Sequence, residues 1–235
     1  MDRDWGVTSS VVEWRADEFV WLYELMSLPG DLLVVVSLLG VLGVYSLYRG
    51  VKSTSGPLVT DRIGVIAGVV IGGLALVVIV ESLVPASRPP LEWHLIEASP
   101  YGFPSGHTLA ALVTWGAVLV WYVEEWSVWV RGGVLVLLVS VVGVSRLLLG
   151  VHYLPDVLAS LVIGSLYLVV CWRVLSGNPW RAFALGGALA IVGVVVSGGG
   201  SRGVIAFVGA VGAVIGWWVI SQDVVRGRVR GVIAG

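Results

Sequence analysis

The residue types that can do acid–base and nucleophilic chemistry gather in one stretch of the chain, residues 88–156. It contains all three histidines, His94, His107 and His152. Two local patterns frame them, Pro104-Ser105-Gly106-His107 and Ser145-Arg146-x5-His152-x3-Asp156, with Arg88-Pro89 upstream. Histidine exchanges protons near neutral pH, and arginine offers a planar fork of donors that matches two phosphate oxygens. The stretch therefore indicates a single site that handles phosphate.

The first pattern predicts the start of a helix. Pro104 ends the preceding loop and Ser105 is suited to the N-cap position. Unpaired N–H groups in the first turn and the helix dipole behind them favour a bound anion such as phosphate. His107 would stand beside that anion, where it could donate a proton to a leaving oxygen.

The second pattern places His152 and Asp156 four residues apart. If a helix begins near His152, the two side chains share a face, and Asp156 would accept a hydrogen bond from one ring nitrogen. The other nitrogen would then be free to act as a nucleophile. Arg88 and Arg146 are the expected partners of the phosphate oxygens.

Other polar residues of the stretch have less specific surroundings. Ser145 either takes part in the site or only hydrogen-bonds within its helix. His94 has no motif around it and is read as an interfacial residue rather than a substrate contact. We expect no metal at the site and no other cofactor, because the histidine and acid spacing lacks a zinc-binding pattern and two arginines would oppose a cation.

The elements that must position these residues are membrane helices. The chain is 57% hydrophobic and 12% charged, which predicts an all-α, polytopic transmembrane bundle. Each apolar segment is close to the ~20 residues that cross a bilayer. There are about seven, a six-helix-type core with extras, at residues 32–48, 63–84, 105–123, 130–149, 156–175, 182–199 and 203–221.

Basic residues predict the orientation, because cytoplasmic connections are rich in lysine and arginine. They fall in alternate connections and in the tail, at Arg49, Lys52, Arg62, Arg131, Arg173, Arg181, Arg226, Arg228 and Arg230. The expectation is a plasma-membrane protein with its N-terminus and candidate site outside and its basic tail in the cytoplasm. The formal net charge of -1 argues against a nucleic-acid partner.

Three regions are expected along the chain. Residues 1–31 predict one amphipathic helix that starts at a capping box, Ser10 to Glu13, and lies in the interface as an anchor or, alternatively, as a lid. Residues 32–175 form the core, and residues 176–235 a transmembrane hairpin and tail. Glycines repeat every four residues at Gly64, Gly68, Gly72 and again at Gly212, Gly216, which favours close helix packing within the monomer over a homo-oligomer contact.

The motifs at 88–89, 104–107 and 145–156 resemble the three signatures of the type 2 phosphatidic acid phosphatase family of integral membrane lipid phosphatases. The resemblance covers roughly residues 63–175. It implies that His152 is a nucleophile forming a phosphohistidine, that Asp156 orients it, and that His107 is the general acid. It further implies that Arg88, Arg146, the Ser105 hydroxyl and the Gly106 N–H bind phosphate, without a metal.

One position departs from the family. The first signature has a lysine seven residues before the arginine, and here that position is Glu81. Either Glu81 points away from the pocket, or the substrate carries its own positive charge or less negative charge.

The expected function is hydrolysis of a lipid phosphate monoester or pyrophosphate at the outer leaflet. Phosphatidic acid-like lipids, phosphatidylglycerol phosphate and polyprenyl pyrophosphate are all compatible with the motifs. The alternatives are a lipid phosphotransferase that uses the same phosphohistidine, and a non-catalytic lipid-phosphate binder or translocator. The expected partners are the lipid substrate and the bilayer.

Overall fold

The computed structural model describes residues 3–53 and 55–234, and these residues form helices and connecting loops. The described part contains no β-strand, only an isolated bridge between Ser87 and Tyr101. Short 3-10 turns cover Asp17–Phe19, Leu28–Gly30 and Leu91–Trp93. The α-helices are α1 (Val7–Trp14), α2 (Val20–Ser27), α3 (Leu32–Lys52), α4 (Asp61–Leu83), α5 (Gly106–Trp121), α6 (Val128–Leu148), α7 (Leu154–Leu175), α8 (Pro179–Val196), α9 (Ser201–Ser221) and α10 (Asp223–Ala234).

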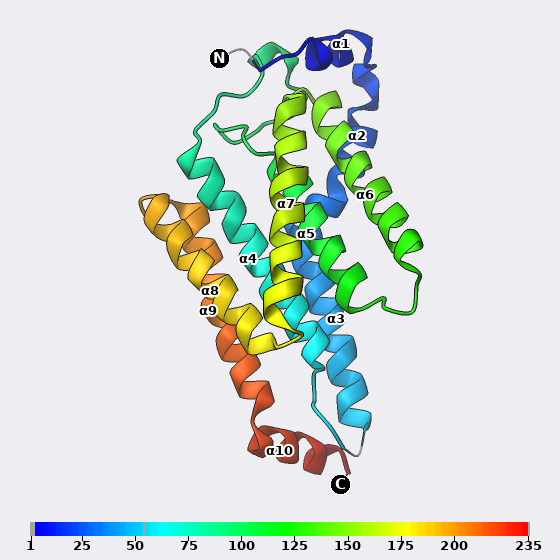
Figure 1. Cartoon of the computed structure of the whole chain (residues 1–235), viewed down its shortest axis with the longest axis vertical. Helices are drawn as coiled ribbons and strands as arrows, with labels where there is room; N and C mark the ends of the chain where they lie inside the picture. The colour runs from blue at the N-terminus through cyan, green and yellow to red at the C-terminus, as the bar shows by residue number, and fades with distance from the viewer. Residues whose placement is uncertain (1–2, 54, 235) are drawn as a thin grey trace.

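Helices α3 to α9 are the seven apolar segments expected from the sequence, so the all-α, polytopic bundle is confirmed. Six of them are long and apolar enough to cross a membrane. The exception is α5, whose 16 residues extend only about 24 Å. Figure 1 shows these helices running along the bundle, with α1 and α2 at one end and α10 across the other.

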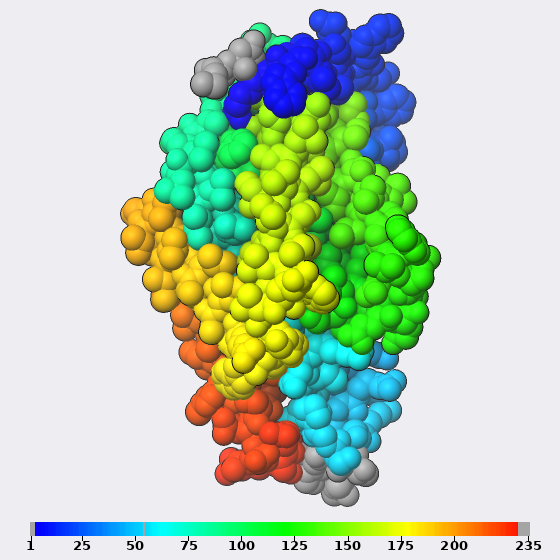
Figure 2. All heavy atoms as spheres, viewed as in Figure 1, coloured from blue at the N-terminus to red at the C-terminus, as the bar shows by residue number. Residues whose placement is uncertain are grey.

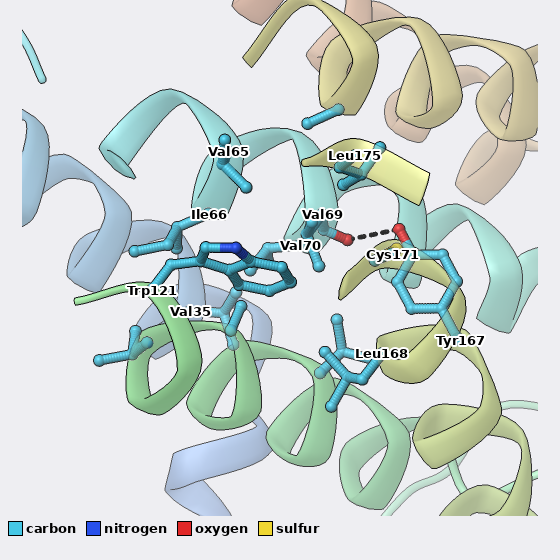
Figure 3. Close-up of a cluster of buried hydrophobic side chains, with 14 of the residues drawn as sticks. Val35, Val65, Ile66, Val69, Val70, Trp121, Tyr167, Leu168, Cys171 and Leu175 are labelled. Atoms are coloured by element: carbon cyan, nitrogen blue, oxygen red, sulfur yellow. Dashed lines mark hydrogen bonds between the residues drawn. The ribbon is translucent and has the colours of Figure 1, made fainter. Parts of the chain in front are cut away.

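The core of the bundle is built around α4, which is largely buried inside the protein. Val65, Ile66, Val69 and Val70 of α4 are completely buried. Figure 3 shows side chains from α3, α5 and α7 packed around them. Within this cluster Tyr167 Oη donates a hydrogen bond of 2.8 Å to the Val69 carbonyl, so this buried hydroxyl is satisfied. This packing fixes α4, α5 and α7, which carry or adjoin the candidate site residues.

The glycine repeat of α4 packs against other helices of the same chain. A Cβ at Gly64 would lie 2.7 Å from Pro179, and one at Gly72 would lie 2.3 Å from the Tyr167 hydroxyl. Packing within the monomer is therefore confirmed for this repeat. It is wrong for Gly212 and Gly216 of α9, where an added Cβ would meet no atom of the described residues within 4 Å.

Replacing Gly68 with alanine is expected to destabilise the bundle. The added Cβ would lie 2.6 Å from the Ala182 carbonyl carbon, so α4 and α8 must move apart, at a cost of about 1–3 kcal/mol. The measurement is thermal unfolding in detergent, with Gly132→Ala as control, since a Cβ there meets nothing within 4 Å among the described residues. Equal midpoints for the two variants would contradict this packing.

The N-terminal segment differs from the expected single helix. The first helix begins at Val7 after Gly6, so Ser10 lies inside it and is not an N-cap; the capping box is wrong. The helix ends at Trp14, and Arg15 turns inward to donate hydrogen bonds to the carbonyls of Trp93 (2.7 Å) and Leu148 (3.0 Å). Because these tertiary contacts interrupt the helical pattern, two short helices form, α1 and α2.

Both short helices cover the end of the bundle that holds the 149–151 loop. Tyr23 of α2 is buried against Leu149 and Val151, and the dark blue surface in Figure 2 caps that end. The two hypotheses for residues 1–31, an interfacial anchor and a lid, both stay predictions.

Candidate active site

A cavity of about 420 Å³ lies beneath α2, at the end of the bundle away from α10. It is lined by five residues that the motifs singled out, Arg88, Gly106, His107, Arg146 and His152. Glu81, which replaces the lysine of the family signature, also lines the cavity. The other lining residues are Glu24, Ser27, Leu28, Asp31, Ile96, Glu97, Ala98, Ser99 and Arg202. Segments far apart in the sequence therefore meet at one pocket.

The link between α6 and α7 delivers His152 to this cavity. Gly150 adopts a positive φ of 71°, a conformation that glycine enters without steric cost. The Val151 N–H then bonds back to the Arg146 carbonyl, and His152 follows just before α7 begins. Its side chain is only 2% exposed, so the turn holds the ring in a fixed position.

The two nitrogens of His152 have different partners. Nδ1 lies 2.8 Å from the Gly102 carbonyl oxygen, which can only accept, so Nδ1 must carry the proton. Nε2 therefore has the lone pair, and it lies 3.0 Å from Nη1 of Arg88, which donates to it. The ring presents an unprotonated Nε2 beside a guanidinium in the cavity wall.

Asp156 lies close to His152 but does not accept the hydrogen bond from its Nδ1–H. Its Oδ2 accepts from the Tyr153 N–H at 2.9 Å and is 3.6 Å from His152 Nδ1. The expected hydrogen bond from the ring to Asp156 is therefore wrong, because the carboxylate bonds the N-cap amide of α7 and the Gly102 carbonyl is nearer. The other oxygen, Oδ1, pairs with Arg3. The fully buried carboxylate still places a negative charge beside the ring.

The two arginines of the motifs are buried differently. Arg88 follows α4 and is tied down: Nη1 donates to the Val151 carbonyl (2.6 Å), and Nη2 donates to Ser99 Oγ (2.9 Å). Arg146, in the last turn of α6, is 4% exposed, and its Nε has no hydrogen-bond partner among the described residues. A buried guanidinium with an unpaired donor is costly unless a ligand completes it.

The start of α5 meets the expectations in part. Ser105 is the N-cap and Gly106 the first helical residue, but the Ser105 side chain caps nothing. Its hydroxyl lies 2.9 Å from the Thr108 hydroxyl and is fully buried, so the structure does not bring it to the cavity. His107 does line the cavity, and its Nε2 is 4.0 Å from Asp31 Oδ2.

Of the two residues named as possible members of the site, Glu81 lines the cavity and Ser145 does not. The Ser145 hydroxyl donates to the Val142 carbonyl inside α6 at 2.7 Å, the helix-internal alternative. Glu81 is buried, lines the cavity and forms an ion pair with Arg202. The hypothesis that Glu81 points away from the pocket is therefore wrong, and its charge is met by a partner within the chain.

Sequence reasoning missed three contributors, Gly102, Asp31 and Arg202. Gly102 acts through a backbone carbonyl, which no residue pattern reports. Asp31 is the last residue of the predicted N-terminal region, residues 1–31, and carried no motif. Arg202 had a usable signal, because it is the single ionisable residue between Ala182 and Ile220, and ionisable residues within membrane segments are functional candidates by default.

The His152 side chain is expected to stay neutral well below pH 6.5. Burial of the ring lowers its pKa, and the charges of Arg88 and Arg146 lower it further, while the hydrogen bond to Gly102 opposes them. The pKa thus falls below the ordinary value of about 6.5, and Arg88→Gln is expected to raise it again. Asp156, at 3.6 Å, remains in both proteins.

Histidine side-chain NMR of the labelled protein measures this directly, because the chain has three histidines and the His152→Ala spectrum identifies the signal. A His152 signal that titrates near 6.5, or one unmoved by Arg88→Gln, would contradict the expected electrostatics.

Comparison with known proteins gives one match. The sequence matches the PAP2 superfamily over residues 63–180, from the first turn of α4 to the start of α8, which includes all three motifs. No curated protein and no solved structure matches the chain. Because the match covers half of the chain and includes the residues around the cavity, the protein belongs to the PAP2 superfamily.

Proposed function

We propose that the protein is a metal-independent lipid phosphatase that works through a phosphohistidine on Nε2 of His152. The observation that carries the proposal is the state of that ring. Its Nδ1–H is held by the Gly102 carbonyl, and Nε2 faces a guanidinium in the cavity. A neutral imidazole with a fixed tautomer and one unprotonated nitrogen can attack phosphorus once Arg88 transfers its hydrogen bond from Nε2 to the phosphate.

In the first step Nε2 forms a bond to phosphorus, and the bond from phosphorus to the lipid oxygen breaks. His107 gives its proton to the leaving oxygen, which departs as the alcohol. Arg88, Arg146 and the Gly106 N–H bind the non-bridging oxygens, the positions where charge must be stabilised in phosphoryl transfer. The buried Asp156 carboxylate offsets the positive charge that the His152 ring acquires.

In the second step water attacks the phosphohistidine. His107, now unprotonated, takes a proton from the water, and the bond from Nε2 to phosphorus breaks. Inorganic phosphate leaves, and neutral His152 and protonated His107 are restored. The arginines supply the positive charge that a metal supplies in other phosphatases, which is the reason for proposing metal independence.

The proposed substrate is a lipid phosphate monoester or pyrophosphate whose chains stay in the bilayer. Its headgroup enters the cavity at the end of the bundle, under the cover of α2. With the basic connections in the cytoplasm, this end lies at the outer leaflet of the plasma membrane.

The test is phosphate release by the detergent-solubilised protein over a panel of lipid phosphates and pyrophosphates, with and without EDTA. The proposal expects release that survives EDTA and is lost in His152→Ala. Transfer of phosphate to an added alcohol, without release to water, would assign the phosphotransferase instead. Binding of the lipids without either reaction would leave a non-catalytic binder.

A further inference from the structure

The ion pair between Glu81 and Arg202 joins the core to the C-terminal hairpin. Glu81 lies in the last turn of α4, and Arg202 is the second residue of α9, after the turn formed by Gly198, Gly199 and Gly200. The Glu81 side chain is 8% exposed, whereas that of Arg202 is 53% exposed. The carboxylate is therefore buried, and the guanidinium that covers it keeps an open side.

The exposed part of Arg202 lies at the candidate active site. Arg202 lines the same 420 Å³ cavity as Arg88, Arg146 and His152. It also lines a neighbouring cavity of about 430 Å³, between the ends of α4 and α9, which shares Glu81 and Ser99 with the first. Arg202 thus stands at the boundary between the two cavities.

The positive charge of Arg202 acts on Arg88, which lines the same cavity. The pKa of Arg88 is lowered, first by burial and also by the positive charge of Arg202, while Glu81 and Asp156 act in the opposite direction. The guanidiniums of Arg88, Arg146 and Arg202 line one cavity, together with the carboxylates of Glu24, Asp31, Glu81 and Glu97. A phosphate would bind where the guanidiniums face the cavity.

The guanidinium of Arg202 has N–H donors that are available to a ligand. Arginine has five N–H donors and no acceptor, and within the described residues the side chain makes a single hydrogen bond, from Nη1 to Glu81. The remaining donors can serve a ligand while the bond to Glu81 holds the group in place. Such a held arginine loses less freedom on binding than a free surface arginine does.

We propose that Arg202 is a third phosphate-binding arginine and that Glu81 is the residue that positions it. The inference rests on the proposed function and adds a residue from α9, outside the part of the chain that matches the superfamily. Arg202 would supply the positive charge that the first motif lacks because Glu81 stands in place of its lysine. The ligand class is a phosphate dianion, bound jointly by Arg88, Arg146 and Arg202.

A purely structural role makes a different prediction. If Arg202 only neutralises the buried Glu81 carboxylate, Arg202→Gln harms the protein by leaving that charge unpaired. Removing both charges, in the double variant Glu81→Gln/Arg202→Gln, would then restore the wild-type properties. If Arg202 binds phosphate, the double variant stays impaired, because the donor to the ligand is still missing.

The experiment compares the wild type, Arg202→Gln, the double variant and Glu81→Lys/Arg202→Gln. Michaelis constants for a lipid phosphate and inhibition by inorganic phosphate are measured under identical detergent conditions. The control is Arg62→Gln, which breaks an exposed ion pair between the first turn of α4 and Glu124 in the connection from α5 to α6.

The expected result is a rise of about tenfold or more in KM and in the inhibition constant of phosphate for Arg202→Gln, the range for a lost charge-assisted hydrogen bond. The double variant keeps the defect, and Glu81→Lys/Arg202→Gln regains part of the affinity by returning a cation to α4. Arg62→Gln behaves as wild type. Wild-type constants in Arg202→Gln or in the double variant would overturn the proposal.

A second readout separates this inference from the proposed function. Thermal stabilisation of each variant by inorganic phosphate needs no turnover and also shows whether the variant is folded. If the wild type hydrolyses no lipid phosphate, the proposed function fails, yet weaker stabilisation of the double variant by phosphate still supports Arg202 as a ligand. Equal stabilisation of the wild type and both arginine variants contradicts it.

Discussion

Replacing His152 with alanine is expected to reduce phosphate release by more than about a thousandfold, the scale seen when a nucleophile is removed. The reason is that Nε2 of this ring is the proposed nucleophile, the atom that bonds to phosphorus, and the other histidine of the cavity, His107, is assigned to proton transfer. The measurement is the steady-state rate of phosphate release from a lipid substrate.

The matched control is His94→Ala. His94 is bonded to the Pro89 carbonyl at 3.1 Å and is not among the residues that line the cavity, so its loss should leave turnover near the wild-type rate. Loss of the His152 ring also leaves the Gly102 carbonyl without its donor, a cost of about 1–3 kcal/mol; thermal unfolding shows whether the variant remains folded. A folded His152→Ala protein with more than about one per cent of wild-type activity would remove His152 as the nucleophile.

The second large effect is expected from Asp156→Asn, a fall in kcat of about a hundredfold or more. The carboxylate lies 3.6 Å from Nδ1 of His152, where its charge stabilises a ring that becomes positive when phosphorylated. Loss of one charge at this distance in a buried site is worth several kcal/mol at most.

The matched control is Asp17→Asn. Asp17 lies at the same end of the bundle, pairs with Arg15 and is 66% exposed, so the same chemical change there should not affect kcat. NMR of the His152 ring adds a second readout, because the Gly102 carbonyl should preserve the Nδ1–H tautomer in Asp156→Asn. A wild-type kcat in Asp156→Asn would refute the electrostatic role, and a changed tautomer would transfer the orienting role back to Asp156.

The helices were predictable because their signal is local. A run of apolar residues near the length of a bilayer crossing is visible in any window of the sequence, and α3 to α9 lie within a few residues of the expected segments. The start of α5 was marked by Pro104 and Ser105, whose backbone preferences act at their own positions.

The N-terminal segment was not predictable in the same way. Its apolar spacing fits one continuous helix, yet Arg15 leaves that helix to bond two carbonyls contributed by residues 93 and 148. These partners lie 78 and 133 residues away in the sequence, and tertiary contacts of this kind override local helix propensity.

The candidate site was predictable where its residues form spaced motifs, and not where it depends on backbone atoms or distant partners. His107, His152, Arg88 and Arg146 reach one cavity as expected. The Gly102 carbonyl took the hydrogen bond assigned to Asp156, because a backbone acceptor from another loop was nearer to the ring.

Glu81, which replaces the lysine of the family signature, is a second residue whose partner could not be predicted from the sequence. An acid in place of a cation predicted either a side chain that points away from the pocket or a less negative or partly positive substrate, but α9 folds back and sets Arg202 against Glu81. The sequence shows both residues, 121 positions apart, and only the fold shows that they pair.

The most direct test of the central claim is to trap the phosphoryl group on the protein. The enzyme is mixed with a lipid labelled in its phosphate, quenched within one turnover at alkaline pH, where phosphohistidine survives, and digested for mass spectrometry. The account predicts one labelled site, Nε2 of His152, and no label in His152→Ala. Label on another residue, or turnover by the wild type with no labelled intermediate at any quench time, would contradict it.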